Sequence, residues 1–212
     1  MIEYVTTADA PAFRRELADM HRLRYRVFHE RLGWDVAVHG DQERDTFDAL
    51  PGTSYLLYHD AFGRLRGCAR LLKTTGPTML RDVFQELLAG APAPSAPTIW
   101  ESTRFAVDDG DGETVANTGT GRVTIALLAG MTEVALRHGI TEVVSVCDVR
   151  VERVLRQTGL PVERIGAPVR IGRSITVAGR YRPTQEVLAA LCLRGQLPAS
   201  VLTNAARIER AA

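Results

Sequence analysis

The chain has 212 residues, of which 45% are hydrophobic and 24% are charged, so it is long enough to bury a substantial core as a globular protein. It contains no apolar run of about 18 residues and no basic leader before an apolar stretch, which argues against a membrane span and a secretory signal. A formal net charge of only +1 argues against general nucleic-acid binding. We therefore expect one domain over residues 1–212, working in the cytoplasm.

The cysteines and histidines show no metal-binding or disulfide pattern. Cys68, Cys147 and Cys192 are far apart and sit among apolar neighbours without CxxC spacing, and the five histidines also lack metal-ligand spacing. We expect buried free thiols and no metal site.

The first half of the chain alternates between helical and strand patterns. A helix is expected to begin near Pro11, after a capping Asp9, and to run through Leu32 with Gly33 as its stop signal. A polar loop is expected at residues 36–50, followed by an antiparallel hairpin of strands 54–60 and 64–72 with a bulge near Gly67. A second helix is expected at 79–88 and a further strand at 98–107.

The second half begins with a loop at 108–121. Helices are then expected at residues 122–138, 151–157 and 184–192, and strands at 141–149 and 173–181. Mixed strands and packed helices predict an α/β fold, an α+β sandwich with one central mixed sheet flanked by helices. The order of elements is similar to that of the acetyltransferase (GNAT)-like fold, in which a cleft between splayed central strands holds an acyl thioester. This is an analogy at the level of the fold.

Six charged residues lie where a core would be apolar, and these are Arg24, Asp45, Asp48, Arg70, Glu101 and Arg104. Burying one such charge alone would be prohibitive, so the six must be paired or reachable by solvent. Three positive and three negative charges suit a network around a polar ligand. Taken singly, each is also compatible with a structural ion pair.

Nine residues resemble, in order and spacing, the signature of the acyl-homoserine-lactone synthases, the autoinducer synthases of bacterial quorum sensing, and these are Arg24, Phe28, Trp34, Asp45, Asp48, Arg70, Phe84, Glu101 and Arg104. The stretches RLLKTTGPTMLRDVF and IWESTRFAV belong to the same resemblance, which is strongest over residues 1–180. It implies synthesis of an acyl-homoserine lactone from S-adenosylmethionine and an acyl thioester, usually on acyl carrier protein. N-acylation would precede a lactonisation that releases methylthioadenosine, with S-adenosylmethionine as a substrate and no permanently bound cofactor.

The chemistry of S-adenosylmethionine suits these residues, because its sulfonium and ammonium call for acidic groups and its carboxylate calls for a cation. The residues expected to bind it are Arg24, Phe28, Trp34, Asp45, Asp48 and Arg70. Phe28 and Trp34 can stack on adenine or face the sulfonium, although core packing explains Phe28 equally well.

Glu101 and Arg104 are the expected catalytic residues. A carboxylate on a buried strand can have a raised pKa, so Glu101 is the candidate base that frees the attacking amine, through a water molecule. Arg104 could hold Glu101 in place or lend positive potential near the reacting carbonyl.

The acyl chain requires an apolar tunnel beside the central sheet, and the residues expected to line it are Met79, Phe84, Trp100, Phe105, Ser145 and Leu188. Ordinary core packing explains each of these apolar residues as well. Members of the resembling family that prefer a 3-oxo chain tend to carry threonine where this chain has Ser145, so the 3-substituent stays open.

The C-terminal region is basic, with eight arginines and two glutamates over residues 149–182. Acyl carrier protein is strongly acidic, and the residues expected to meet it are Arg150, Arg153, Arg156 and Arg164. A solvated surface is an equally good explanation of this charge.

Three rival functions follow from the same residues. The first is a synthase of this family that uses acyl-coenzyme A, because the arginines could also meet nucleotide phosphates. The second is a general N-acyltransferase, although NTGTGR at 117–122 departs from the phosphate loop of that fold. The third is a DNA-binding regulator, for which no helix-turn-helix pattern is found.

Overall fold

The computed structural model describes residues 1–108 and 121–203, and its centre is a mixed sheet in the order β1-β4-β5-β6-β7-β10-β8, with β9 also pairing with β10. The strands are β1 (Ile2–Thr6), β4 (Ser54–His59), β5 (Leu65–Lys73), β6 (Ile99–Val107), β7 (Glu142–Asp148), β8 (Glu163–Arg164), β9 (Val169–Ile171) and β10 (Ser174–Tyr181). The pair β6·β7 is parallel and the other pairs of this sheet are antiparallel. The α-helices are α1 (Arg14–Arg24), α2 (Met79–Asp82), α3 (Arg122–Arg137), α4 (Val149–Gln157) and α5 (Gln185–Gly195).

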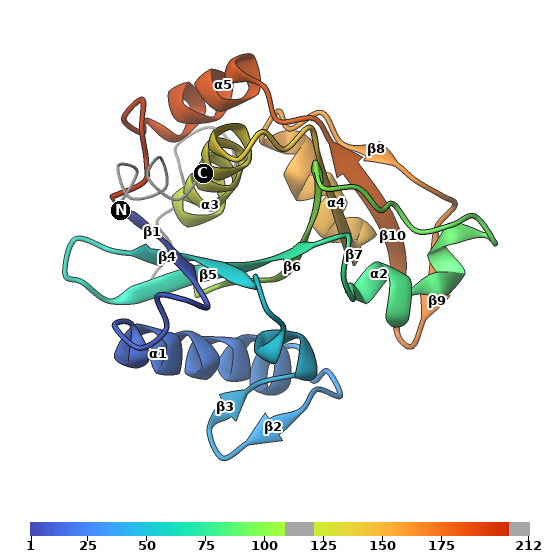
Figure 1. Ribbon diagram of the computed structural model, residues 1–212, viewed down its shortest axis with the longest axis horizontal. Helices are drawn as coiled ribbons and strands as arrows, with labels where there is room; N and C mark the ends of the chain where they lie inside the picture. Colours follow the sequence, from blue (N-terminus) through green and yellow to red (C-terminus); the bar gives the residue numbers. More distant parts are fainter. Residues whose placement is uncertain (109–120, 204–212) are drawn as a thin grey trace.

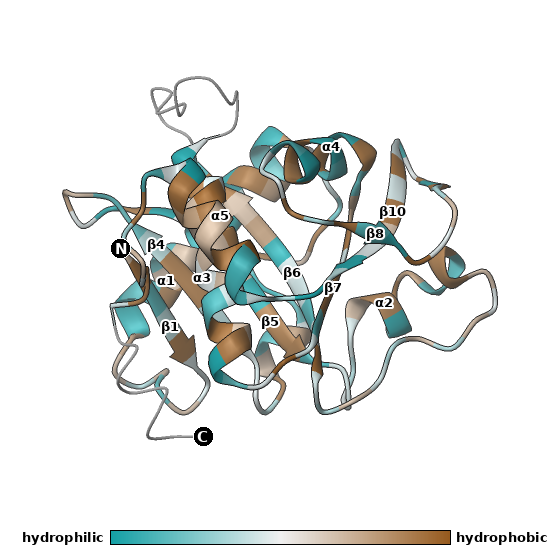
Figure 2. Cartoon of the chain, turned by 90° about the horizontal axis from the view of Figure 1, so that it is seen from above, coloured by the Kyte–Doolittle hydropathy of each residue, from teal (hydrophilic) through white to brown (hydrophobic). Residues whose placement is uncertain are grey.

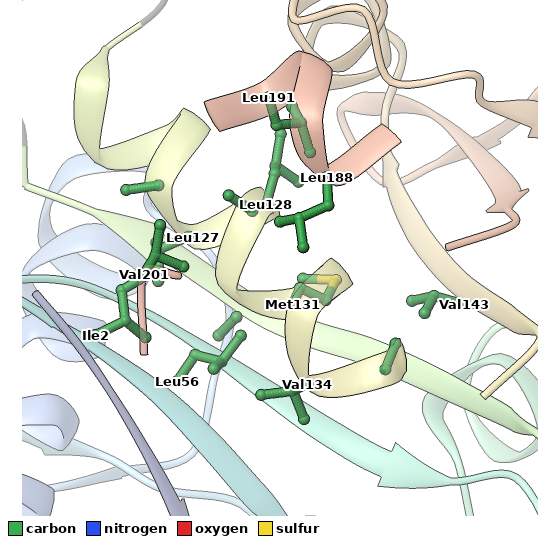
Figure 3. Close-up of a cluster of buried hydrophobic side chains, with 14 of the residues drawn as sticks. Ile2, Leu56, Leu127, Leu128, Met131, Val134, Val143, Leu188, Leu191 and Val201 are labelled. Carbon is green, nitrogen blue, oxygen red and sulfur yellow. The ribbon is translucent and has the colours of Figure 1, made fainter. Parts of the chain in front are cut away.

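The helices cover both faces of the sheet, with α1 on one face and α3 and α5 on the other (Figure 1). Because side chains alternate along a strand, Leu56 packs in the cluster under α3 whereas its neighbour Leu57 packs in the cluster under α1. Helix α3 is apolar along most of its length (Figure 2), which fits its position between the sheet and α5. Leu188 and Leu191 of α5 meet Leu128 of α3 in this core (Figure 3). The predicted α/β sandwich around a central mixed sheet is confirmed.

The two central strands separate along their length. Strand β6 pairs with β7 only where Ile99–Ser102 meets Glu142–Ser145, although β6 continues to Val107 and β7 to Asp148. Within the described ranges, the later residues of each strand have no hydrogen-bonded strand on the side that faces the other. The sequence analogy predicted splayed strands of this kind, which leave backbone N–H and C=O groups available to a ligand.

A close approach of α3 explains one glycine of the hairpin. A Cβ atom at Gly67 would lie 2.7 Å from Cγ1 of Val123, so any larger residue would push the helix off the sheet. A register shift between Tyr58 and His59 lies opposite Gly67, where the sequence predicted a bulge.

Several boundaries differ from the sequence prediction. The first helix begins at Arg14 and not near Pro11, because Asp9 accepts hydrogen bonds from Thr6 and closes a turn there. The expected loop at 36–50 contains the short hairpin β2 (Val38–His39) and β3 (Gln42–Glu43) and the 3-10 helix η2 (Thr46–Ala49). The expected helix at 79–88 is divided into α2 and the 3-10 helix η3 (Gln85–Leu88). The edge strands β1, β8 and β9 were not predicted.

The end of the first helix is also different from an ordinary α-helix. From Tyr25 to Arg31 the chain continues as a π-helix, η1, and the N–H of Trp34 then bonds to the carbonyl of Phe28 at 2.9 Å. Such π-helical turns are rare and are frequently found at functional sites.

Within residues 1–108 and 121–203, no helix combines the length and the apolar character that a membrane span requires.

Candidate functional site

A buried ion network lies between α1 and the sheet, and its innermost cation is Arg24. The guanidinium donates to Glu43 Oε2 at 2.5 Å and to both oxygens of Asp48 at 2.8 and 2.9 Å. The side chains of Arg24 and Glu43 are 0% exposed. Arg24 therefore forms a bidentate pair with Asp48 in surroundings without solvent, where such a pair has its greatest strength.

Arg70 on β5 joins the same carboxylates from the sheet. Its guanidinium donates to Asp45 at 2.5 and 3.0 Å, to Asp48 at 2.9 Å, and to the hydroxyl of Thr103 on β6 at 2.9 Å. The loop carboxylates are held for this purpose by a capping box, in which Asp45 accepts from the N–H of Phe47 and Asp48 from the N–H of Asp45. The short helix η2 thus presents two aspartates to the sheet in one fixed geometry.

Arg104 completes the network from a strained position on β6. Its backbone has a φ of +50°, and a register irregularity in the β5·β6 pairing lies at this point. A non-glycine residue in this region costs about 1–3 kcal/mol and is often found at functional sites. The bulge directs the side chain to Glu43 Oε1 at 3.0 Å and to Asp45 Oδ2 at 2.8 Å.

The pKa values show how the network keeps its charges. Burial would raise the pKa of Asp48, but hydrogen bonds and charge from Arg24 and the charge of Arg70 hold it well below its usual range. Burial likewise opposes the charge of Arg24, but Asp48 and Glu43 raise its pKa. Arg24 and Asp48 thus remain ionised together because each of these desolvated charges has an opposite partner.

The π-helix places two aromatic rings at the edge of this network. The rings of Phe28 and Trp34 are stacked with centroids 5.2 Å apart and an interplanar angle of 6°. The guanidinium of Arg104 lies 5.7 Å from the Phe28 centroid. Phe28 is buried, whereas Trp34 is 44% exposed, so the stack leads from the buried charges to the surface.

Glu101 lies outside the ion network. The carboxylate is 0% exposed and accepts from the backbone N–H of Leu80 at 3.2 Å to each oxygen. Burial raises its pKa to about 7, against hydrogen bonds from Leu80 and Thr78 and the charge of Arg70. Of the two roles expected for Arg104, holding Glu101 does not fit the structure, because the strained backbone directs Arg104 to Glu43 and Asp45. The other role, positive potential near the reacting carbonyl, stays a prediction.

The third carboxylate of the network is therefore Glu43, which the sequence analysis missed. It lies on β3, a two-residue strand inside a segment that reads as a polar loop, so no periodicity marked it as buried. Tyr55, whose hydroxyl donates to Asp48 at 2.9 Å, was missed as well. Charge balance offered one signal, since a protonated Glu101 leaves three arginines with only two aspartates.

The six residues predicted to line an acyl tunnel lie on different faces of the sheet. Trp100 and Leu188 belong to the core cluster under α3, and Phe105 packs against it. Phe84 packs with Leu80 in a separate cluster over β7 and β10. Two surface cavities of about 280 and 440 Å³ contain none of the six.

Two of the six tunnel residues make polar contacts. Ser145 donates to the carbonyl of Ser102 at 2.9 Å, across the last paired residues of β6 and β7. The sulfur of Met79 accepts from Arg104 and Arg70, at 3.3 and 3.5 Å. Ser145 thus lies where the central strands begin to separate, and Met79 lies at the ion network.

The predicted docking arginines divide into two pairs. Buried Glu152 holds Arg156 at 3.0 Å and Arg164 at 2.6 Å, and hydrogen bonds from Arg164 lower the pKa of this glutamate. Arg150 and Arg153 are exposed and form no ion pair within the described structure. Two of the four positive charges are therefore available to a partner without breaking an existing pair.

No group of three or more His, Cys, Asp or Glu side chains that could hold a metal ion is found among residues 1–108 and 121–203. In the ion network the arginines already occupy the carboxylate oxygens. The three cysteines are free, and burial raises the pKa of Cys68 to about 12, which makes it a poor nucleophile at neutral pH.

Comparison with known proteins identifies the family of this chain. The model of the family described as autoinducer synthase matches residues 11–191. The chain belongs to the autoinducer synthase family. An acyl-homoserine-lactone synthase of Rhizobium radiobacter is 40% identical over 184 residues, 84% of this chain and of that protein. The chain is therefore an acyl-homoserine-lactone synthase, a member of an acyltransferase enzyme family.

Solved structures support the same assignment. The AHL synthase LasI superimposes with a TM-score of 0.79 at 35% identity, covering 90% of this chain and 93% of that one. BjaI, a CoA-dependent acyl-homoserine lactone synthase solved with SAM and isopentyl-CoA, superimposes with a TM-score of 0.84 at 27% identity, covering 99% of both chains. A Lactobacillus plantarum protein assigned as an N-acetyltransferase shares the fold alone, with a TM-score of 0.56 at 16% identity over 86% of this chain and 99% of that one. The predicted acetyltransferase-like sheet is thus confirmed.

Proposed function

We propose that this autoinducer synthase joins S-adenosylmethionine to an acyl chain delivered by acyl carrier protein, and then closes the lactone with release of methylthioadenosine. The observation that carries the proposal is the pairing of two unlike sites. An ion network that includes Arg70 and Arg104 lies beside a buried carboxyl, Glu101, whose pKa of about 7 allows it to take and return a proton near neutral pH.

The network suits the charges of S-adenosylmethionine. Asp45 and Arg104 are its partly exposed members, 13% and 12% in the side chain, so they offer a carboxylate and a guanidinium to the ammonium and carboxylate of the substrate. The exposed face of Trp34 can stack on the adenine ring or face the sulfonium. We assign Arg24, Phe28 and Asp48 to holding these groups in position, and Arg70 to binding the substrate beside Asp45.

The first bond is made when the amine attacks the thioester carbonyl. Glu101, acting through a water molecule, takes the proton that the amine loses and returns it to the sulfur of the donor, which leaves as a thiol when the carbon–sulfur bond of the thioester breaks. Arg104 supplies positive potential for the oxygen of the carbonyl as negative charge develops on it. In the second step a carboxylate oxygen attacks the γ-carbon of the same molecule, the carbon–sulfur bond breaks, and neutral methylthioadenosine leaves. Because this step is intramolecular, holding a folded conformer supplies much of the acceleration.

The acyl donor reaches the amine through the separation of β6 and β7. Beyond Ser102 and Ser145 the facing backbone groups of the two strands are available to the amides of a pantetheine arm, which acyl carrier protein and coenzyme A share. We retain Phe84, Trp100, Phe105, Ser145, Leu188 and Met79 as candidates for contact with the acyl chain.

The exposed arginines favour the carrier protein as donor. Arg150 and Arg153, which pair with no carboxylate among residues 1–108 and 121–203, present positive charge at α4, close to the end of β7, where an acidic helix can dock. The CoA-dependent relative BjaI makes coenzyme A the second candidate.

The test offers the purified protein S-adenosylmethionine with C4 to C16 acyl chains on carrier protein or on coenzyme A, and detects lactone and methylthioadenosine by mass spectrometry. We expect lactone from the carrier-protein panel. The double charge reversal Arg150→Glu with Arg153→Glu should lower kcat/KM for carrier-bound chains at least several-fold, more at low salt than at high salt. Arg15→Glu, an exposed reversal on α1, is the matched control. Lactone from coenzyme A alone would replace the donor, and no product from either panel would overturn the proposal.

A further inference from the structure

Two arginines of the ion network converge on one sulfur atom. Nη1 of Arg104 lies 3.3 Å from Sδ of Met79, and Nη2 of Arg70 lies 3.5 Å from the same atom. A thioether is a weak acceptor, whereas the other N–H groups of Arg70 go to carboxylates and to the hydroxyl of Thr103. The position of the sulfur is therefore where two cationic donors have their weakest partner.

Met79 also lies on the less deeply buried side of the network. Met79 is 8% exposed, and Asp45 and Arg104 are 13% and 12% exposed in the side chain, whereas the side chains of Arg24 and Glu43 are fully buried. A methionine side chain has three rotatable bonds and repacks easily. It can leave this position without unfolding the inner ion pairs.

The position lies next to the proposed base. Met79 is the first residue of α2, and the N–H of the following residue, Leu80, is one of the groups that hold Glu101. A ligand atom that replaced the sulfur would thus be held by two guanidinium groups. It would lie at Met79, the residue that precedes Leu80 in the chain.

We infer that Met79 is a displaceable positioning residue over an oxyanion subsite formed by Arg70 and Arg104. A substrate oxygen replaces the sulfur and accepts from both guanidinium groups, so that two weak N–H···S contacts become charge-assisted hydrogen bonds. This inference rests on the proposed function, which supplies two sources of that oxygen, the carboxylate of S-adenosylmethionine and the carbonyl of the thioester. Two guanidinium donors favour the carboxylate, because it offers two charged acceptor oxygens.

Two substitutions of similar size separate this role from simple packing. Met79→Leu keeps apolar bulk and removes the acceptor, so that no sulfur contact has to be broken when the oxygen arrives. Met79→Gln offers a stronger acceptor, an amide oxygen, which competes with the substrate for the same donors. The two variants should therefore shift affinity in opposite directions.

The measurement is calorimetric titration of the whole protein with S-adenosylmethionine and with its decarboxylated analogue. We expect the leucine variant to bind S-adenosylmethionine about 3- to 10-fold more tightly than the natural chain, and the glutamine variant to bind it more weakly by a similar factor. Binding of the decarboxylated analogue should change by less than about twofold in either. Thermal unfolding of each variant reports separately whether it is folded.

The other outcomes are distinct. Unchanged affinity for S-adenosylmethionine with opposite changes in kcat/KM for the acyl donor would assign the subsite to the thioester carbonyl. Parallel changes for both ligands, or no change in binding and turnover, would leave Met79 as a packing residue and overturn the inference alone. A natural chain that binds no S-adenosylmethionine would overturn the proposed function together with the inference.

Discussion

Two carboxylates on the same side of this sheet are similarly buried, and their pKa values are shifted in opposite directions. Asp48 is 1% exposed in the side chain and accepts from Arg24, Arg70, Tyr55 and the backbone of Asp45, so its pKa is held far below the usual range. Glu101 is 0% exposed, accepts from backbone and hydroxyl groups and has no directly bonded cation in the part of the chain that the structure describes, so burial raises its pKa to about 7.

The role of a buried charged residue in this protein therefore depends on its bonded partners and not on its burial. Ionised groups that are paired in the interior hold the elements that bear them in fixed positions. A carboxyl that is buried without a cation can exchange a proton near neutral pH. The following predictions break one side of this contrast at a time, from the largest expected effect to the smallest.

Removing one charge from the ion network should have the largest effect. Asp48→Asn leaves Arg24 and Arg70 buried with too little negative charge, and we expect it to lower the free energy of unfolding by about 3–5 kcal/mol. Urea unfolding followed by circular dichroism measures this change. Asp41→Asn, at a surface pair with a 68% exposed carboxylate, is the control and should cost less than about 1 kcal/mol. A similar small loss in both variants would contradict the network's structural role.

Neutralising Glu101 should affect turnover more than binding. Glu101→Gln keeps an oxygen for the N–H of Leu80 and removes the proton acceptor, so we expect kcat to fall about 10²- to 10⁴-fold while affinity for S-adenosylmethionine stays within about twofold. In the natural protein kcat should fall as the pH drops below about 7, because the base becomes protonated. Equal losses of binding and turnover would instead make Glu101 a structural residue.

The same substitution should stabilise the fold, and the gain should depend on pH. The folded-state pKa of Glu101 is raised from 4.5 to about 7, so its ionisation destabilises the folded state, increasingly from pH 4.5 to 7 and fully above pH 7. Glu101→Gln removes this cost and should add about 3 kcal/mol to the free energy of unfolding at pH 8 and almost nothing at pH 4. Unfolding in urea at both pH values tests this, with Glu86→Gln at an exposed position as the control. A gain that does not grow with pH would contradict the raised pKa.

Some features of the fold and of the ion network could be predicted from patterns within single segments of the sequence. Long periodic segments identified the sheet and the larger helices, including the last helix, which was expected over residues 184–192 and is found at Gln185–Gly195. Improbable charges in apolar segments indicated a network, and the structure joins Arg24, Asp45 and Arg70 with their partners in one. These patterns lie within short segments of the chain, so they can be recognised without a structure.

The features that were missed depend on geometry that one sequence does not encode visibly. Glu43 lies in a two-residue strand, too short to show alternation. The π-helical turn before Arg31 changes which residues share a face without changing the composition of the segment. The bulge at Arg104 turns a side chain predicted to meet Glu101 toward another carboxylate. In contrast, β1 alternates buried Ile2 with a half-exposed neighbour and had a readable signal.

The smallest effect is expected at the rim, where neither kind of carboxylate is disturbed. Trp34 is 44% exposed and stacks on Phe28, so its loss should change the free energy of unfolding by less than about 1 kcal/mol. Trp34→Ala should nevertheless weaken binding of S-adenosylmethionine about 5- to 10-fold, since a stacked aromatic pair contributes about 0.5–1.5 kcal/mol beyond the area it buries. Trp34→Phe should retain most of the affinity, and Phe62→Ala, at an 83% exposed ring on the β4·β5 turn, should retain all of it. Calorimetric titration distinguishes these cases, and an unchanged affinity in Trp34→Ala would remove the indole from the binding site while leaving the buried contrast intact.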